Sequence, residues 1–491
     1  MIERLTDLLT YHADEPLIFS SGMFLMLFLG FSFVYMLLQR RLTARLLFVT
    51  AFSYYFYYKS SGFYFFLLAV VTVSDYLIAG LIDRHRRNKG LARWLLVTSV
   101  TVDLGLLAYF KYTNFFAGMV ARMIGCNFQP WDIFLPVGIS FFTFQSLSYT
   151  IDVYRGALKP LPSLLDYAFY VSFFPQLVAG PIVRVADFAP QIRRPLSVSK
   201  KMFATGVYLI AVGLFKKAIV SDYISLNFVD RIFENPALYS GLENLLGVYG
   251  YALQIYCDFS GYSDMAIGLA ALLGFTFPPN FRSPYKSASI TEFWRRWHIS
   301  LSTWIRDYIY ISLGGNRKGK LRQNLHLLLT MLLGGLWHGA SLNFVAWGGM
   351  HGIALAAHKF WHSEVLHRPR QAESRGWRRV AGAVLTFHFV CFTWIFFRQP
   401  TFADATNMIG QIVGNFHPEL LPQIISGYRY VFALMIFGYL VHLLPEGFQT
   451  ATVGILQRCN VFVCALILSI VIYVVIQTQS STIQPFIYFR F

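Results

Sequence analysis

Long apolar stretches, separated by short polar connections, run through most of this chain. Six of them approach or reach the roughly 20 residues that a helix needs to cross the hydrocarbon layer of a membrane: Leu17–Leu38, Gly62–Ile82, Met202–Ile219, Leu325–Ala357, Val380–Phe397 and Val461–Ile476. Four more are shorter or interrupted: Leu46–Tyr58, Trp94–Phe110, Phe134–Ile151 and Tyr167–Pro181. The pattern predicts an all-α polytopic membrane protein with about ten to fourteen membrane-embedded segments.

The composition supports this fold class. The 491 residues are 56% hydrophobic, 18% aromatic and only 13% charged, which is more apolar surface than one soluble core can hide. The net charge of +17 would suit a nucleic-acid partner, but Lys and Arg collect in short loops at the ends of apolar stretches. Because cytoplasmic loops of membrane proteins attract such clusters, we expect a lipid bilayer as partner and no nucleic acid. The five cysteines show no metal-ligand spacing, so no metal site is predicted.

The charged loops also indicate an orientation. Arg40, Arg41 and Arg45 follow the first apolar stretch, whereas the residues before it are mainly acidic, which places the N-terminus outside the cell. That stretch is long and is closed by Arg, so we expect a membrane anchor and no signal peptide. Basic residues flank Tyr167–Pro181 on both sides, and its Pro and Gly residues predict a re-entrant segment. Leu46–Tyr58 spans only about 20 Å at 1.5 Å per residue, which indicates a locally thin bilayer or a partly inserted helix.

One apolar stretch holds an imidazole at bilayer depth, in the run Gly334-Gly335-Leu336-Trp337-His338-Gly339. A protonatable group there costs several kcal/mol unless it faces a polar cavity, so His338 is a candidate functional residue whose expected partner is His298. The small residues beside His338 have two interpretations: they let another helix pack closely, or they leave room for a substrate chain. The polar run Asp258–Asp264, inside another apolar segment, favours a function.

The block Ser289–Ile311 has a different pattern. Ser289 and Glu292 form the S-x-x-E pair of a helix capping box. Aromatic and apolar residues then recur at three- and four-residue steps, which predicts one amphipathic helix at a membrane boundary, ended by the Gly314–Arg317 run. Glu292 precedes Arg296 by four residues, the favourable order for an ion pair that supports the helix.

Six runs of the sequence carry a family resemblance: Leu135–Phe141, Ile151–Gly156, Ala179–Pro181, Tyr256–Gly268, Ser289–Asn316 and Met331–Ala340. They are similar to the signature regions of the membrane-bound O-acyltransferase superfamily, and particularly of its bacterial alginate O-acetyltransferase branch. The signature region covers about residues 130–352, and residues 380–491 are less diagnostic. The resemblance implies one membrane domain over residues 1–491: a ring of transmembrane and re-entrant helices around a thinned central funnel.

The resemblance also implies an activity and a site. His338 occupies the position of the family's invariant histidine, and His298 that of its second histidine. The acyl donor would enter from the cytoplasm, and the acyl group would leave towards an extracytoplasmic polysaccharide or acyl-relay protein. The expected location is the inner membrane of a bacterium, which the chain crosses several times.

Acyl transfer from a thioester to a hydroxyl group needs a base whose pKa lies near the operating pH, and imidazole has one. His338 is the predicted base; it would deprotonate the acceptor, or carry the acyl group itself as an acyl-imidazole. His298 would orient or polarise the reacting groups. We expect no tightly bound cofactor and, as donor, acetyl-coenzyme A or another acyl thioester, attracted by the Arg residues of this region unless they form only a basic helix rim. Those Arg residues are Arg295, Arg306 and Arg317, and the predicted substrate-binding set is Trp297, Trp337, Arg295, Arg306, Asp258 and Asn316.

Three other functions fit part of the pattern. Within the superfamily, the same histidines resemble those of the subunit that passes D-alanine to teichoic acid. A transporter or polysaccharide-export channel would be expected to show inverted repeats with broken helices, and no repeat is evident. A non-catalytic scaffold for polymer-synthesising enzymes would not need buried histidines. O-acyl transfer is therefore the preferred interpretation.

Overall fold

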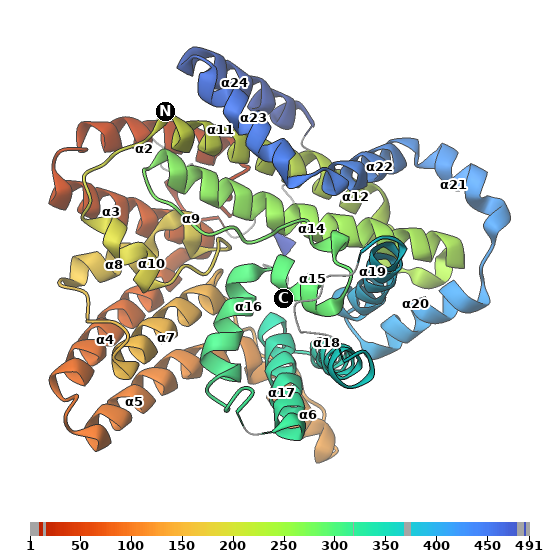
Figure 1. The fold of residues 1–491 in the computed structure, drawn as a ribbon, viewed down its shortest axis with the longest axis horizontal. Coiled ribbons are helices and arrows are strands. Elements are labelled where there is room, and N and C mark those ends of the chain that lie inside the picture. Colours follow the sequence, from red (N-terminus) through yellow and green to blue (C-terminus); the bar gives the residue numbers. More distant parts are fainter. Residues whose placement is uncertain (1–8, 13–15, 318, 368–374, 479–485, 488–491) are drawn as a thin grey trace. The chain divides into compact units, whose positions relative to one another are not determined.

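The computed structural model describes residues 9–12, 16–317, 319–367, 375–478 and 486–487. In this part of the chain the regular elements are all helices, which confirms the predicted fold class (Figure 1). The chain forms two compact units: unit 1 comprises residues 1–211, 262–278 and 456–490, and unit 2 comprises residues 212–261, 279–455 and 491. It passes between them within three helices, α11 (Lys200–Leu214), α14 (Gly241–Leu272) and α23 (Glu446–Arg458).

Unit 1 is built around helices from the N-terminal part of the chain. Their apolar side chains interlock at Phe174, whose ring lies 5.1 Å from Phe52 and 5.4 Å from Phe31 between centroids. The segment Tyr167–Pro181 is broken after Ser172 and is buried, as irregular backbone at membrane depth requires. The helices are α2 (Gly22–Leu37), α3 (Leu42–Ser61), α4 (Phe65–Arg84), α5 (Lys89–Leu107), α6 (Thr113–Met123), α7 (Ile139–Arg155), α8 (Leu164–Ser172), α9 (Phe174–Leu177), α10 (Val185–Ile192) and α24 (Val461–Thr478).

Unit 2 contains the block Ser289–Ile311 and both candidate histidines. Its helices are α12 (Asp222–Ile224), α13 (Asp230–Glu234), α15 (Ile290–Arg296), α16 (Ile299–Ile305), α17 (Lys320–His338), α18 (Leu342–Phe360), α19 (Trp377–Arg398), α20 (Phe402–Gly414), α21 (Leu421–Gly427) and α22 (Arg429–Leu443). Two π-helical turns matter for the site: η7 (Arg306–Tyr310) continues α16, and η8 (Trp361–Val365) continues α18.

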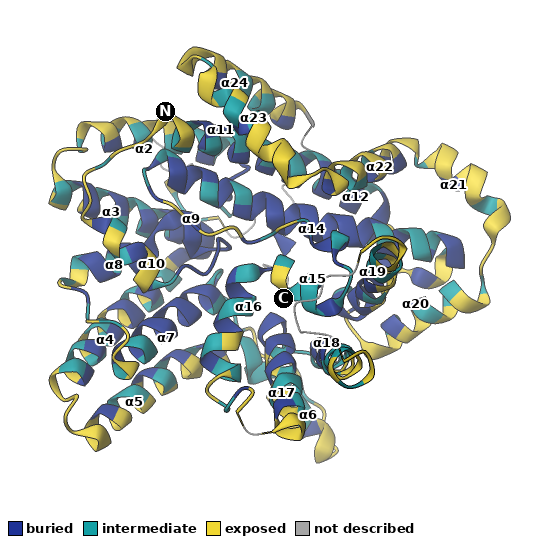
Figure 2. Ribbon diagram, in the orientation of Figure 1, coloured by how far each residue is buried: buried dark blue, intermediate teal, exposed yellow. Residues whose placement is uncertain are grey.

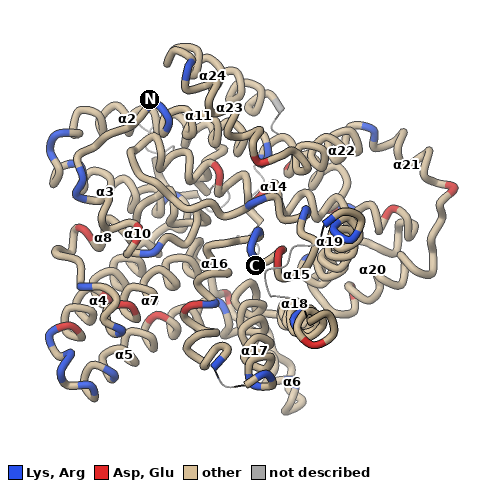
Figure 3. The backbone as a smooth tube through the Cα atoms, in the orientation of Figure 1, with Lys and Arg blue, Asp and Glu red and all other residues tan. Residues whose placement is uncertain are grey.

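Within the described residues, four helical stretches are long and apolar enough to cross a membrane, and a bent helix pair makes up to five. They are Leu42–Arg84, Lys89–Met123, Lys200–Glu234 and Trp377–Arg398, with the pair Pro418–Gly427 and Arg429–Leu443. This number is below the predicted ten to fourteen segments because several predicted segments are short helices. The chain is a multi-pass membrane protein, and many of its large apolar side chains are exposed. Figure 2 marks the exposed positions along the helices in yellow. Basic residues gather in the connections between α2 and α3 and between α4 and α5 (Figure 3).

One element of the thin-bilayer argument is wrong. The apolar stretch Leu46–Tyr58 belongs to α3, which runs over 20 residues from Leu42 to Ser61. At 1.5 Å per residue this helix is about 30 Å long, enough to cross an ordinary bilayer. The polar residues at its ends hid its length from a count of apolar positions.

The predicted single membrane segment Leu325–Ala357 is also wrong, because it is a helical hairpin. Helix α17 ends at His338, the chain turns, and α18 returns beside it, so that Lys320 at the start of α17 reaches Glu364 beyond the end of α18 at 2.8 Å. Glycine makes this close approach possible. A Cβ atom at Gly335 would collide with the carbonyl oxygen of Phe344, and one at Gly348 with that of Met331.

Candidate active site

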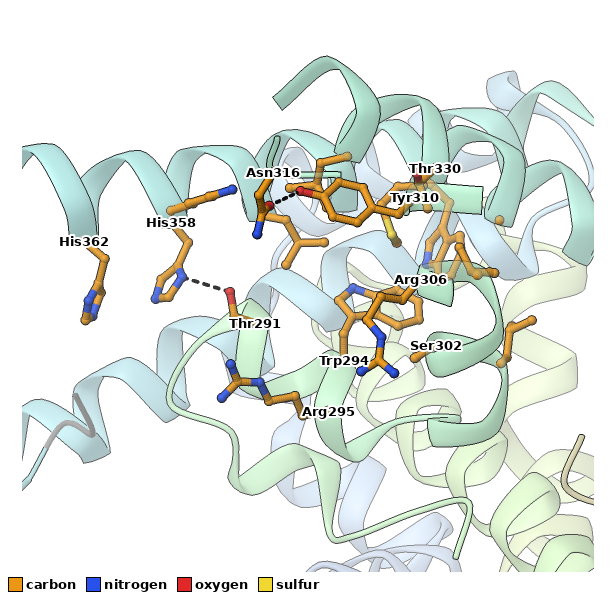
Figure 4. Close-up of a pocket in the computed structure, with 18 of the residues that line it drawn as sticks. Thr291, Trp294, Arg295, Ser302, Arg306, Tyr310, Asn316, Thr330, His358 and His362 are labelled. Atoms are coloured by element: carbon orange, nitrogen blue, oxygen red, sulfur yellow. Dashed lines mark hydrogen bonds between the residues drawn. The ribbon is translucent and has the colours of Figure 1, made fainter. Parts of the chain in front are cut away.

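A cavity of about 390 Å³ lies in unit 2 along the α17–α18 hairpin (Figure 4). Residues of α15, α16 and η7 form its other wall. His338, Gly334 and Trp347 line it near the hairpin turn, whereas His358 and His362 line it fifteen or so residues further along α18 and η8. At 1.5 Å per residue, Trp347 and His362 are roughly 22 Å apart along the helix, so the cavity is elongated.

The end of the cavity away from the hairpin turn is basic. Arg295, Lys359, His358 and His362 line it (Figure 4). Thr291 ties α15 to α18 there through a 3.0 Å hydrogen bond to His358 Nδ1 (Figure 4). Burial lowers the pKa of His358, and the neighbouring His362 and Arg295 lower it further.

Arg306 lines the cavity beside Trp294 and Ser302 and is paired with a carboxylate there (Figure 4). Its Nε and Nη2 donate to the two carboxylate oxygens of Asp307 at 2.7 and 3.1 Å. These hydrogen bonds raise the pKa of Arg306 above its usual value. Asn316, another predicted substrate-binding residue, also lines the cavity and accepts a 2.6 Å hydrogen bond from the Tyr310 hydroxyl. Three predicted binding residues, Arg295, Arg306 and Asn316, are thus brought to one cavity.

His338 is the last residue of α17 and lines the cavity with only 2% of its surface exposed. Its ring lies against Trp337, Trp347 and Phe397, at centroid distances of 4.9, 5.1 and 5.3 Å. The close-packing interpretation of the neighbouring glycines holds for Gly335, and room for a substrate chain beside Gly334 stays a prediction. Gly335 allows the hairpin to close, whereas Gly334 lines the cavity.

His298 is fully buried and does not line this cavity. It contacts the indole of Trp337 at 6.1 Å between ring centroids, and His338 contacts the same indole at 4.9 Å. The two histidines therefore share Trp337 as a neighbour. The family resemblance also implies a second cavity, from the other side of the membrane, that meets this one near His338; this stays a prediction.

The expectation of one continuous helix over Ser289–Ile311 is wrong at His298. Half of the predicted capping box forms: Ser289 Oγ accepts from the Glu292 N–H at 3.2 Å, whereas the Glu292 carboxylate accepts from the N–H of Ala288 at 2.9 Å. Glu292 also pairs with Arg296 at 2.9 Å, as predicted. The helix then stops at Arg296, and His298 has a left-handed backbone with φ of 42°. Such a conformation is uncommon for a residue with a side chain and is held only where tertiary contacts impose it.

Two predicted substrate-binding residues lie outside the cavity. Asp258 in α14 forms a buried ion pair with Lys217 at 2.6 Å, and Lys217 also pairs with Asp222 at 2.8 Å. Trp297 is 1% exposed and stacks on Phe293 with centroids 5.6 Å apart. These contacts favour a structural role for Asp258 and Trp297 in place of the predicted contact with substrate. Trp337, also predicted to bind substrate, is a neighbour of both His298 and His338.

Sequence reasoning missed much of the cavity wall. Trp294 lines the cavity and donates its indole N–H to His351 Nδ1 at 3.3 Å. His351 Nε2 lies 3.0 Å from the Thr393 hydroxyl, which itself donates to the Val390 carbonyl, so His351 donates there. A signal was present, since Trp347, His351, Leu355, His358 and His362 recur at three- and four-residue steps along α18 and η8. In the described part of the chain, no three His, Cys, Asp or Glu side chains gather as a metal site would need.

Comparison with known proteins identifies the family. Residues 98–398 match the membrane-bound O-acyltransferase family, MBOAT, and this region includes the hairpin, the cavity and both histidines. The chain belongs to this family. It is therefore an acyltransferase of the membrane-bound O-acyltransferase type, which confirms the predicted enzyme class over the transporter and scaffold alternatives.

Curated relatives extend the comparison beyond the family region. The chain is 42% identical over 402 residues to a protein named "Probable alginate O-acetylase AlgI" from Pseudomonas syringae pv. tomato, covering 80% of this chain and 74% of the relative. It is 35% identical over 368 residues to the peptidoglycan O-acetyltransferase of Helicobacter pylori, covering 70% of this chain and 68% of the relative. The teichoic acid D-alanyltransferase of Bacillus subtilis is more distant, at 30% identity over 287 residues, covering 56% of this chain and 71% of the relative.

Proposed function

We propose that this membrane-bound O-acyltransferase moves an acetyl group from a cytoplasmic acyl thioester to hydroxyl groups of an extracytoplasmic polysaccharide, in the inner membrane of a bacterium. The observation that carries the proposal is the elongated cavity, with a basic end at Arg295 and Lys359 and the imidazole of His338 near the hairpin turn. Relatives named as O-acetyl-transferring enzymes of alginate and peptidoglycan support the acetyl group and the polysaccharide. D-alanyl transfer has less support, because the D-alanyltransferase relative matches a smaller part of the chain.

The cavity suits a long anionic donor such as acetyl-coenzyme A. Arg295 and Lys359 supply positive charge for phosphate groups at one end, and Arg is the side chain that binds phosphate with two parallel hydrogen bonds. Largely apolar walls, including Leu327, Met331 and Trp347, then lead towards His338. A thioester arm of roughly 20 Å would place its carbonyl carbon at the imidazole.

His338 is the group that acts on the acyl carbonyl or on the acceptor. In direct transfer, its imidazole accepts the proton of the acceptor hydroxyl, the oxygen attacks the thioester carbonyl, the C–S bond breaks, and the thiol leaves with that proton. In the two-step route, an imidazole nitrogen attacks the carbonyl, the thiol leaves, and the acceptor hydroxyl then takes the acyl group from the imidazole. Both routes use the same cavity and deliver the same ester and thiol.

The second proposed substrate is the acceptor of the acetyl group. A polysaccharide hydroxyl, or the hydroxyl of an acyl-relay protein, would receive the acetyl group on the extracytoplasmic side. Isotope-labelled acetyl-coenzyme A, given to the purified protein in vesicles, tests the donor. Mass analysis of cell-surface polymer from cells with and without the gene tests the acceptor, and polymer with unchanged ester content in both would overturn the proposal.

We predict that Arg295→Gln raises the KM for acetyl-coenzyme A about 10-fold and changes kcat little, because a charge-assisted hydrogen bond to a phosphate is worth roughly 1.4 kcal/mol or more. Arg317→Gln is the matched control. Arg317 belongs to the same basic region of the sequence but does not line the cavity, so its KM should stay at the wild-type value. Equal effects of the two substitutions would contradict donor binding at this end.

We predict that His298→Ala lowers kcat about 100-fold while the KM for the donor stays within about twofold, because a buried polarising group acts on the reacting centre and not on the phosphate groups. His388→Ala, which removes an exposed imidazole of α19, is the control and should be fully active. Steady-state kinetics of both variants measure these kcat and KM values. Full activity of His298→Ala would remove His298 from the mechanism.

A further inference from the structure

Asn280 sits between the backbone and the side chain of the strained segment at His298. It is 1% exposed and belongs to the loop that precedes α15. Its main-chain oxygen accepts from the Ile299 N–H at 2.9 Å, and its side-chain oxygen accepts from the Ser300 N–H at 3.3 Å. These two N–H groups belong to the first two residues of α16. The residue at the N-cap position, His298, provides no side-chain cap, so Asn280 caps α16 from outside the helix.

The same contacts orient the amide of Asn280. A backbone N–H can only donate, so the side-chain atom that faces Ser300 must be the oxygen and not the NH₂ group. The Ser300 hydroxyl donates to the same oxygen at 2.9 Å. The amide oxygen of Asn280 is therefore an acceptor in every contact that it makes in this cluster.

His298 Nδ1 lies 3.1 Å from that oxygen. Because the Asn280 oxygen has no proton to give, Nδ1 must carry the proton and donate it. In the neutral imidazole, Nε2 is then the nitrogen with the lone pair. The ring has little freedom to turn, since Phe259 lies edge-on to it at 4.6 Å between centroids and Trp337 lies at 6.1 Å.

We propose that Asn280 is a positioning residue for acyl transfer: it holds His298 as the Nδ1-protonated tautomer, with the lone pair on Nε2. Its neutral amide achieves this without placing a charge beside the imidazole. The proposal rests on the proposed part of His298 in acyl transfer, but the tautomer itself is a property of the resting protein. It can be measured whether or not the protein transfers an acetyl group.

The test uses solid-state NMR on the full-length protein with ¹⁵N-labelled histidine, in lipid bilayers. The His298 signals are those lost in the His298→Gln variant. We expect a protonated Nδ1 and an unprotonated Nε2 in the wild-type protein. Asn280→Ala should abolish this single tautomer and lower kcat roughly 10- to 100-fold, with the donor KM nearly unchanged.

A conservative variant and a matched control separate positioning from stability. Asn280→Asp keeps the acceptor oxygen, so it should restore the tautomer. Its negative charge favours the imidazolium form and should shift the acid limb of the kcat profile to higher pH. Asn244→Ala removes another fully buried Asn of unit 2, whose amide donates to the Pro236 and Tyr239 carbonyls, and should leave both the tautomer and the pH profile unchanged.

Two results would overturn the proposal: an unprotonated Nδ1 at His298 in the wild-type protein, or an Asn280→Ala variant with unchanged His298 signals and the same activity as Asn244→Ala. A protein with the expected tautomer but no acetyl-transfer activity would instead refute the proposed function and leave the Asn280 contact standing. The two failures are thus distinguishable.

Discussion

Replacing His338 by alanine is expected to reduce acyl transfer at least about 1,000-fold, to the background rate, while the protein still folds and inserts in the membrane. The imidazole is the nitrogen base that lines the cavity beside the hairpin turn, and both proposed chemical routes need it. His338 ends α17, so alanine there removes no main-chain hydrogen bond of the helix. Ester content of the cell-surface polymer and turnover of labelled acetyl-coenzyme A measure the effect.

The control for this substitution is His326→Ala. His326 lies on the same helix, three turns before His338, and does not line the cavity. It removes the same chemical group from α17 and should retain activity within about twofold. Normal acetylation by a normally expressed His338→Ala protein would refute the assignment of His338 as base or acyl carrier.

Replacing Gly335 by valine is expected to destabilise unit 2 by more than about 3 kcal/mol and to abolish activity with it. A Cβ atom at this position collides with the main-chain oxygen of Phe344, which no side-chain rotation can relieve. Either the two helices move apart or α17 unwinds, and both changes displace His338. Thermal unfolding of the protein in detergent, followed by a thiol-reactive dye or by circular dichroism, measures the loss.

The matched control is Gly349→Ala in the second helix of the same hairpin. Its added Cβ would lie 3.4 Å from the end of the Leu332 side chain, an ordinary contact that this side chain can accommodate. Helix propensity even favours alanine there by up to about 1 kcal/mol. A Gly335→Val protein that unfolds at the same temperature as Gly349→Ala would contradict the close approach of α17 and α18.

Local features of the sequence were predictable where the physical cause is local. The Ser289 cap on the Glu292 N–H forms as expected, because its donor and acceptor lie within one turn of helix. The Glu292–Arg296 pair forms for the same reason. The prediction that this helix continues through His298 was wrong. Asn280, which lies outside the block Ser289–Ile311, accepts the hydrogen bonds of the first two N–H groups of α16.

The apolar stretch Leu325–Ala357 shows what hydropathy alone cannot predict. Apolar length indicates that a segment can lie in a membrane, but it carries no information on whether the chain turns within it. The turn after His338 becomes evident only from the packing of Gly335 on Phe344 and of Gly348 on Met331. The two glycines before His338 therefore differ in their surroundings: Gly335 packs against α18, whereas Gly334 borders the cavity.

The sequence by itself determined the fold class, the membrane location and the acyltransferase family, and it singled out two candidate histidines, because apolar length, basic loops and short motifs depend on residues that are neighbours in the chain. Only the tertiary structure decided which of these residues share a cavity and how each imidazole is oriented. Those properties depend on distant partners: Asn280 reaches His298 across 18 positions, and Thr291 reaches His358 across 67. Periodicity describes one element at a time, whereas such contacts form only when several elements have packed together.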